Sequence, residues 1–186
     1  MGSVMKSEQT RARIRVAAAT VIEREGAGHL TLDKVAAEAG LSKGGLLYHY
    51  PTKDALLEGL LGHLLQGRAE LVDKLTSEDS IDHGSLLNAL IDADFDRPEE
   101  ERIIAQGLIA ASAENADLLQ PARDHVMALF AQLGTSKRVA APARTILLAS
   151  QGLQVLELLG LLSLSAAERN QIRQHLKALT LELHPC

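Results

Sequence analysis

The stretch TLDKVAAEAGLSKGGLLYHYPTK, over residues 31–53, constrains the fold of this chain more than any other. It predicts two short helices, because Thr31 and Ser42 are suitable N-cap residues and Gly40 can adopt the positive φ of a tight turn between them. Pro51 ends the second helix, since proline lacks an amide hydrogen and clashes with the preceding turn. The sequence therefore predicts two short helices that cross at a glycine.

Small and apolar residues stand where two crossing helices need them. Ala36 and Ala39 permit a close approach, while Val35, Leu46 and their neighbours can fill the space beneath. The second helix begins at residues 42–45 (SKGG), whose amides and side chains can meet phosphates or base edges. This arrangement is that of a helix-turn-helix unit, whose second helix enters the DNA major groove.

Residues 31–57 resemble the DNA-binding motif of the TetR-type transcriptional repressors, which covers about a quarter of the chain. That family commonly has a Thr-capped helix, an Ala-Gly-Val-Ser turn, a Leu-Tyr-x-His-Phe ending and a Lys that opens the next helix. The corresponding residues here are Thr31, AGLS at 39–42, LLYHY at 46–50, and Lys53. The tyrosine that usually follows the leucine is Leu47 here, so either Tyr48 takes its role or one phosphate contact is missing.

The resemblance implies a set of DNA contacts. The expected phosphate contacts are Thr31, Lys43, Tyr48, His49 and Lys53, and the positions of base reading are Ser42, Lys43, Gly44 and Gly45. Lys53 opens a helix, where the dipole disfavours a cation unless an anion such as phosphate is near. Two alternatives remain: the segment is a helical hairpin with a solvated basic end, or His49 has a structural role under Tyr50 and Pro51.

The rest of the chain predicts an all-α protein, because helical periodicity dominates and aromatic and β-branched residues are too few for a sheet protein. We expect an N-terminal helix-turn-helix domain of three helices over residues 1–52, and a larger helical domain for effector binding and dimerisation over residues 53–186. The predicted helices, after Ser7 as N-cap of the first, are 7–25, 31–38, 42–49, 52–75, 85–95, 97–115, 116–133, 137–162 and 165–183.

The charge of the chain is unevenly distributed. The formal net charge is -5, yet residues 1–53 carry +3 and the remainder carries -8. An acidic protein of this kind can still bind DNA through one basic face. The single Cys186 excludes an intrachain disulfide, and neither a secretory signal nor a membrane span is recognisable, so we expect a cytoplasmic protein without membrane association.

A homodimer through the last two helices is expected, since two recognition helices must reach successive major grooves. From Val139 to Leu162 the predicted helix is apolar on more than one face, and Leu176, Leu179 and Leu183 form a stripe on the last helix. A helix that is apolar all round must be buried on two sides. The alternative is a single central core helix.

The family resemblance also implies an effector pocket among the central helices. Candidate lining residues are His63, Phe95, Gln106, Met127, Phe130 and Gln151. For each of them, ordinary core or surface is the competing interpretation. Because aromatic residues are scarce, a modest aliphatic pocket for a small apolar or amphipathic effector is favoured over a broad aromatic one.

Other motifs are weak. Asp92, Asp94 and Asp96 have the spacing of a calcium loop, but Arg97 occupies the position that requires glycine, so capping and solvation explain these acids. No metal-ligand cluster, cofactor motif or catalytic constellation is recognisable. The sequence therefore predicts a ligand-responsive DNA-binding transcriptional regulator, a repressor by resemblance, and not an enzyme. The alternatives are an all-α interaction module without DNA binding and a helical enzyme.

Overall fold

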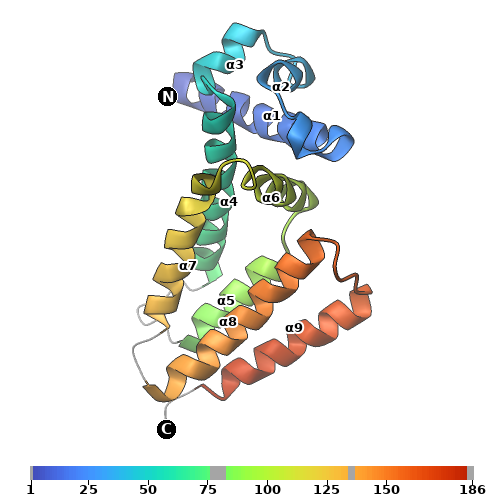
Figure 1. Ribbon diagram of the computed structural model, residues 1–186. Coiled ribbons are helices and arrows are strands. Elements are labelled where there is room, and N and C mark those ends of the chain that lie inside the picture. The colour runs from blue at the N-terminus through green and yellow to red at the C-terminus, as the bar shows by residue number, and fades with distance from the viewer. Residues whose placement is uncertain (1, 76–82, 134–136, 184–186) are drawn as a thin grey trace. The chain divides into compact units, whose positions relative to one another are not determined.

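The computed structural model describes residues 2–75, 83–133 and 137–183, and within them the chain is all-α, as predicted (Figure 1). The α-helices are α1 (Gly2–Glu25), α2 (Leu32–Glu38), α3 (Lys43–His49), α4 (Lys53–Leu75), α5 (His83–Phe95), α6 (Glu99–Ala111), α7 (Gln120–Gln132), α8 (Lys137–Leu158) and α9 (Ala166–Leu181). Two short 3₁₀ helices, η1 (Ala27–His29) and η2 (Ala116–Leu119), precede α2 and α7. Among the described residues, no helix is both long enough and apolar enough to cross a membrane.

Local sequence signals fix the helix boundaries around the predicted motif. The side chain of Thr31 caps α2 and that of Ser42 caps α3, as expected from their positions. Gly26 ends α1 with φ of 83°, and Gly40 ends α2 with φ of 63°, in the region that favours glycine. These four residues therefore define the connections on both sides of α2.

Several helix boundaries differ from the prediction, as the ends of α1 and α8 illustrate. Helix α1 begins at Gly2 rather than Ser7, and Thr10 bonds the carbonyl of Lys6 within the helix, so hydroxyl residues do not stop it. Helix α8 ends at Leu158 rather than residue 162, because Gly160 turns the chain with φ of 67°. The expected loop at 76–84 lies mostly, and the break at 134–136 entirely, outside the described residues.

Capping does not explain Asp96, which precedes α6. Helix α6 starts at Glu99 after Pro98, and no side chain caps its first turn. Asp96 instead pairs with Arg173 of α9, whose two terminal nitrogens lie 2.7 and 2.6 Å from its oxygens. A charge-assisted bidentate pair is stronger than a capping bond, so the tertiary contact takes the carboxylate.

The described chain packs as two compact units. The first comprises the residues up to Leu64 with Pro98–Ala122, and the second comprises Leu65–Arg97 with the residues from Arg123 onward. Because α4 contributes residues to both, the boundary proposed near residue 53 remains a prediction.

The first unit buries the apolar faces of α1 and the start of α4. Five apolar residues of α1 that recur at helical spacing are buried: Ile14, Ala17, Ala18, Val21 and Ile22. On α4 the leucines 56, 57, 60 and 61 are buried. Helix α1 packs on α2 and α6, and α2 packs on α3. This core supports the two short helices of the motif.

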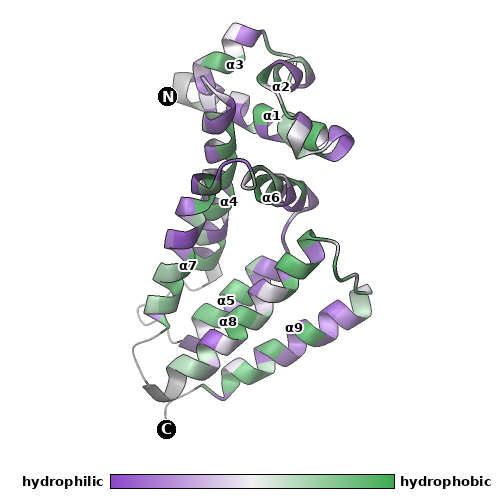
Figure 2. Cartoon of the chain, in the orientation of Figure 1, coloured by the Kyte–Doolittle hydropathy of each residue, from purple (hydrophilic) through white to green (hydrophobic). Residues whose placement is uncertain are grey.

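The second unit is a helical bundle in which α5 packs against both α8 and α9 (Figure 1). Hydrophobic colour follows α5 and α8 in Figure 2. The core of this unit consists of Leu86, Leu87, Leu90, Ile91, Phe95, Leu129, Leu133, Ala143, Ile146, Leu147, Leu153, Leu176 and Leu183. Helix α9 begins with a full capping box, in which Ser165 and Glu168 satisfy each other's backbone amides.

Candidate DNA-binding site

The turn between α2 and α3 is a helix C-terminus closed by glycine. The amide of Leu41 donates to the carbonyl of Ala36 (2.9 Å), and the amide of Gly40 donates to that of Ala37 (3.1 Å). This is the Schellman pattern, which satisfies carbonyls that the helix end leaves free. The backbone of the turn is therefore specified by Gly40, as the sequence predicts.

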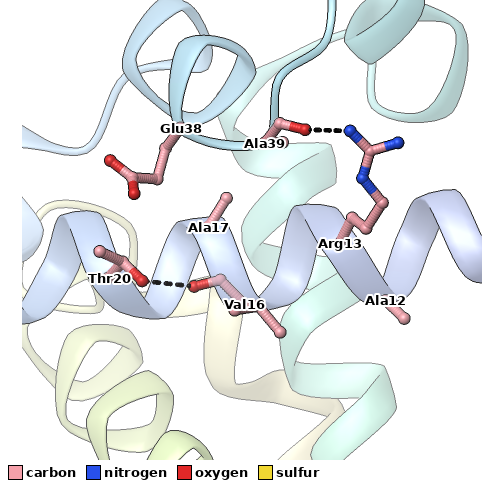
Figure 3. Close-up of a pocket in the computed structure, with 7 residues that line it drawn as sticks. All are labelled: Ala12, Arg13, Val16, Ala17, Thr20, Glu38 and Ala39. Atoms are coloured by element: carbon pink, nitrogen blue, oxygen red, sulfur yellow. Dashed lines mark hydrogen bonds between the residues drawn. The ribbon is translucent and has the colours of Figure 1, made fainter.

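A side chain from α1 holds the same turn from beneath. The guanidinium of Arg13 donates through Nη2 to the carbonyl of Ala39, the C-cap residue of α2 (Figure 3). Ala17, Val16 and Thr20 lie along the adjoining face of α1, and Thr20 bonds the carbonyl of Val16 at 3.1 Å. Helix α1 therefore positions α2 through both packing and a cationic hydrogen bond.

Helix α3 is anchored by one face only. Leu46 is fully buried, and the adjacent Tyr50 places its ring so close to Gly59 of α4 that a Cβ there would lie 2.4 Å from Cε1 of the ring. Burial of a leucine contributes about 1.5–3 kcal/mol. Ser42 accepts a hydrogen bond from the amide of Gly45 (3.1 Å), which orders the first turn.

The opposite face of α3 points to solvent. Ser42, Lys43 and Gly44 are exposed, and Tyr48 is 84% exposed. His49 is half-buried, and its ring meets that of Tyr48 edge to face at 5.2 Å between centroids. Three of the four predicted base-reading positions and Tyr48 are thus accessible, whereas Gly45 is half-buried.

The remaining predicted DNA contacts flank α3. Thr31 is exposed at the start of α2 and accepts a hydrogen bond from the amide of Lys34 (3.3 Å). Lys53 is half-buried in the first turn of α4, after Thr52, which accepts a bond from the amide of Ala55 (3.0 Å). Leu47 is half-buried, whereas Tyr48 is exposed. The burial pattern therefore favours Tyr48 as the residue that takes the tyrosine's role.

Several cations of the first unit are already paired with acids. Nζ of Lys43 lies 2.9 Å from Oδ1 of Asp33, and both side chains are about two-thirds exposed, at 64% and 66%. Hydrogen bonds from Lys34 and Arg24 lower the pKa of the Glu25 carboxyl. Exposed pairs of this kind contribute little stability, so a phosphate can replace the acid as the partner of Lys43.

The six predicted pocket residues are spread over both units. His63 and Gln106 belong to the first unit, where Gln106 is exposed. The other four belong to the second unit: Phe95 is buried, Phe130 and Gln151 are half-buried, and Met127 is exposed. Phe95 and Phe130 pack in the same core cluster. The pocket itself stays a prediction.

The sequence interpretation of Asp92, Asp94 and Asp96 as capping and solvated acids is wrong for Asp94, while Asp92 is half-buried and Asp96 is exposed. Asp94 is fully buried and receives hydrogen bonds from Arg68 and other residues, while Asp92 and Asp96 pair with cations of α9. The signal that could have identified Asp94 is an acid within the apolar stretch LLNALIDADF. Among the described residues, no group of three or more His, Cys, Asp or Glu could hold a metal ion.

Two family models match this chain. Residues 14–60 match "Bacterial regulatory proteins, tetR family", and residues 84–181 match "Tetracyclin repressor-like, C-terminal domain". The second match covers more than half of the chain. The first lies over the helix-turn-helix unit, and the second lies over α5 to α9.

Individual relatives agree with these matches. The chain is 28% identical over 123 residues to the nucleoid occlusion factor SlmA of Vibrio vulnificus, covering 66% of this chain and 55% of that protein. It is 31% identical over 77 residues to the HTH-type transcriptional regulator TtgR of Pseudomonas putida, covering 41% and 37%. The chain thus spans about half the length, or less, of these relatives.

A solved structure agrees over the whole fold. A TetR-family transcriptional regulator from Rhodococcus sp. superposes with a TM-score of 0.70 at 23% identity, covering 94% of this chain and 98% of that one. At this identity the likeness concerns the fold.

Proposed function

Since this chain belongs to the TetR family of DNA-binding transcriptional regulators, a family without enzymatic activity, we propose that it is a repressor that a small molecule releases from its operator. The proposal places it in the cytoplasm, where its operator is. One observation carries the DNA-binding part: α3 exposes Ser42, Lys43, Gly44 and Tyr48, while Leu46 on its other face is fully buried. A helix held in this way can enter a groove without unfolding its support.

The DNA contacts follow from this surface. Gly44 has open space where a Cβ would lie, so the backbone of α3 can approach a base edge or a phosphate closely. We propose as the phosphate contacts Lys43, Lys53, Thr31, Tyr48 and His49. Each cation that contacts a phosphate releases counterions, which makes the affinity dependent on salt.

A homodimer through α8 and α9 presents two such surfaces to one duplex. The exposed apolar residues Leu148, Val155 and Leu156 recur at helical spacing on α8, Leu159 directly follows its end, and Leu181 is exposed on α9. Covering this face with the same face of a second copy removes apolar surface from water. Two half-sites separated by about 34–36 Å are the expected operator geometry.

Binding of the purified protein to labelled duplexes from beside its own gene tests the DNA-binding part. Affinity measured by fluorescence anisotropy at several salt concentrations should fall steeply with salt, and Lys43→Ala and Lys53→Ala should each reduce the slope of log K against log salt by about 1. Lys74→Ala, at the end of α4, is the matched control and should leave the slope unchanged. An unchanged slope in the Lys43→Ala, Lys53→Ala double variant rejects these contacts.

The oligomeric state tests the proposed interface. Leu156→Glu should convert a dimer into a monomer in light scattering coupled to size exclusion, because a charge would be buried at the interface. Met127→Glu, also at an exposed apolar side chain, is the control and should remain dimeric. A dimer that survives Leu156→Glu contradicts an interface on this face of α8.

A further inference from the structure

A buried carboxylate joins three helices of the second unit. Asp94 of α5 is fully buried, and its Oδ1 accepts a hydrogen bond from Nη1 of Arg68 of α4. Its Oδ2 accepts from Oγ of Ser150 (2.7 Å) and from Nε2 of Gln151 (3.1 Å), both on α8. Asp94 therefore uses both oxygens but engages only Nη1 of the Arg68 guanidinium.

The other edge of that guanidinium has no partner. Nε and Nη2 of Arg68 are buried and donate to no acceptor among the described residues, and the side chain is only 10% exposed. These two nitrogens carry parallel N–H groups whose spacing matches the two oxygens of a carboxylate. Folded proteins leave few buried donors unpaired, because each unpaired donor loses its bonds to water. The free edge is thus a preformed bidentate donor.

The local charge favours an anion as the partner of this edge. Nη2 of Arg97 lies 3.9 Å from Oδ1 of Asp94, so two guanidinium groups share one carboxylate. Burial and the charge of Arg68 lower the pKa of His125, which therefore adds no charge at neutral pH. The unpaired N–H groups of Arg68 are cationic donors in an interior of low dielectric, where a charged acceptor is bound more strongly than a neutral one.

Further donors and apolar groups lie around the cluster. Nε2 of Gln154 is buried without a partner, one helical turn beyond Ser150 on the same face of α8, and Nε2 of His125 is also buried and unpaired. Leu147 and Leu153 on α8 belong to the apolar core of this unit. These surroundings suit a molecule with one acidic group and an apolar body.

We propose that the Nε and Nη2 edge of Arg68 binds the carboxylate of an organic acid, which is the effector of this regulator. This inference rests on the proposed function and narrows the effector class. Both nitrogens are closed to solvent, so the acid must displace the side chains packed on them. Binding is thereby linked to a rearrangement around α4, α5 and α8, and a ligand acts on DNA affinity only through such a difference between states.

Matched pairs of an acid and its amide test the proposal. Isothermal titration of the full chain with octanoate and octanamide, and with benzoate and benzamide, compares ligands of equal shape that differ in the charged group. We expect at least one acid to bind about tenfold or more tightly than its amide, the difference that a hydrogen bond to a charged group provides. The proposal is overturned when neither acid binds more tightly than its amide.

Variants locate the acid preference. The double variant Arg68→Met, Asp94→Asn removes both charges without leaving a lone buried carboxylate, and it should lose the preference. Arg173→Gln removes another ion pair, which joins α9 to Asp92 of α5, and is the control that should keep the acid preference. Should the double variant fail to fold by circular dichroism, Arg68→Lys retains the charge without the planar fork and should still lose most of the preference. An acid preference that survives in a folded Arg68 variant overturns the assignment.

A separate DNA titration of the wild-type protein distinguishes the two proposals. Acid binding without any binding to duplex DNA contradicts the regulatory function and leaves the Arg68 site standing. DNA binding without acid preference contradicts the Arg68 site alone.

Discussion

Two ion pairs of similar chemistry lie in opposite surroundings in the two units. Lys43 and Asp33 are 64% and 66% exposed, whereas Arg68 and Asp94 are 10% and 0% exposed. An exposed pair contributes at most about 1 kcal/mol, so it can be exchanged for another partner. Removal of one member of a buried pair leaves an uncompensated charge. The difference indicates that the exposed pair of the first unit can exchange its partners, whereas Arg68 and Asp94 hold each other in the interior of the second unit.

The largest expected effect on stability comes from a substitution that breaks the buried pair of Arg68 and Asp94. Asp94→Ala should reduce the free energy of unfolding by about 3–5 kcal/mol, because Arg68 stays buried without its carboxylate. Asp33→Ala should change it by less than about 1 kcal/mol. Urea unfolding followed by circular dichroism measures both. Equal effects of the two substitutions would contradict the contrast between the units.

A smaller effect concerns the support of α3. Gly59→Ala should lower stability by about 1–3 kcal/mol, because the new Cβ would overlap the Tyr50 ring at 2.4 Å. Gly62→Ala, one turn later in open space, should instead stabilise α4 by up to about 1 kcal/mol. Thermal unfolding separates the two. A stabilised Gly59→Ala variant would show that the Tyr50 contact does not anchor the reading helix.

The pH dependence of stability sharpens the description of the buried cluster. Burial, and secondarily Arg68, lower the pKa of His125 from its ordinary 6.5, so the unfolded chain binds more protons than the folded one. Stability contributed by neutral His125 should therefore be lost as pH falls through about 6.5 toward the lower folded pKa. His125→Gln should flatten this part of the profile of melting temperature against pH. Met127→Gln, on the same helix, should retain the wild-type profile.

The smallest effect concerns the exposed pair. Asp33→Asn should strengthen DNA binding several-fold, because Lys43 loses its competing carboxylate, a change of less than about 1 kcal/mol. Glu23→Gln removes one exposed acid from α1 and controls for net charge. Anisotropy titrations at constant salt measure the difference. Weaker binding of Asp33→Asn would show that Asp33 positions Lys43 for the duplex.

The sequence predicts the helix-turn-helix unit at the level of single residues, because its determinants are local. The caps Thr31 and Ser42 and the positive φ of Gly40 act within a few residues of the chain, and each is where the pattern places it. The Arg13 bond to Ala39 spans 26 residues and was not foreseen. Local patterns do not reveal which carbonyl a distant guanidinium reaches.

The buried cluster of the second unit could not be predicted for the same reason. Asp94 meets Ser150 across 56 residues, and Asp92 meets Arg173 across 81. In the sequence these acids are one short periodic run, and only tertiary packing assigns each a different environment. Helical periodicity shows which residues are buried, but not which polar residues meet one another inside the core.

The pair of glycines at the start of α3 has a mechanical consequence. A seven-residue helix that contains Gly44 and Gly45 cannot persist by itself, since each glycine weakens a helix by about 1 kcal/mol and a segment this short is marginal even without glycine. Its helical structure is stabilised by the tertiary packing of Leu46 and Tyr50. A change that loosens the packing of these two residues would therefore unfold α3. The proposed DNA-contacting surface would then be lost without any rigid-body movement of the helix.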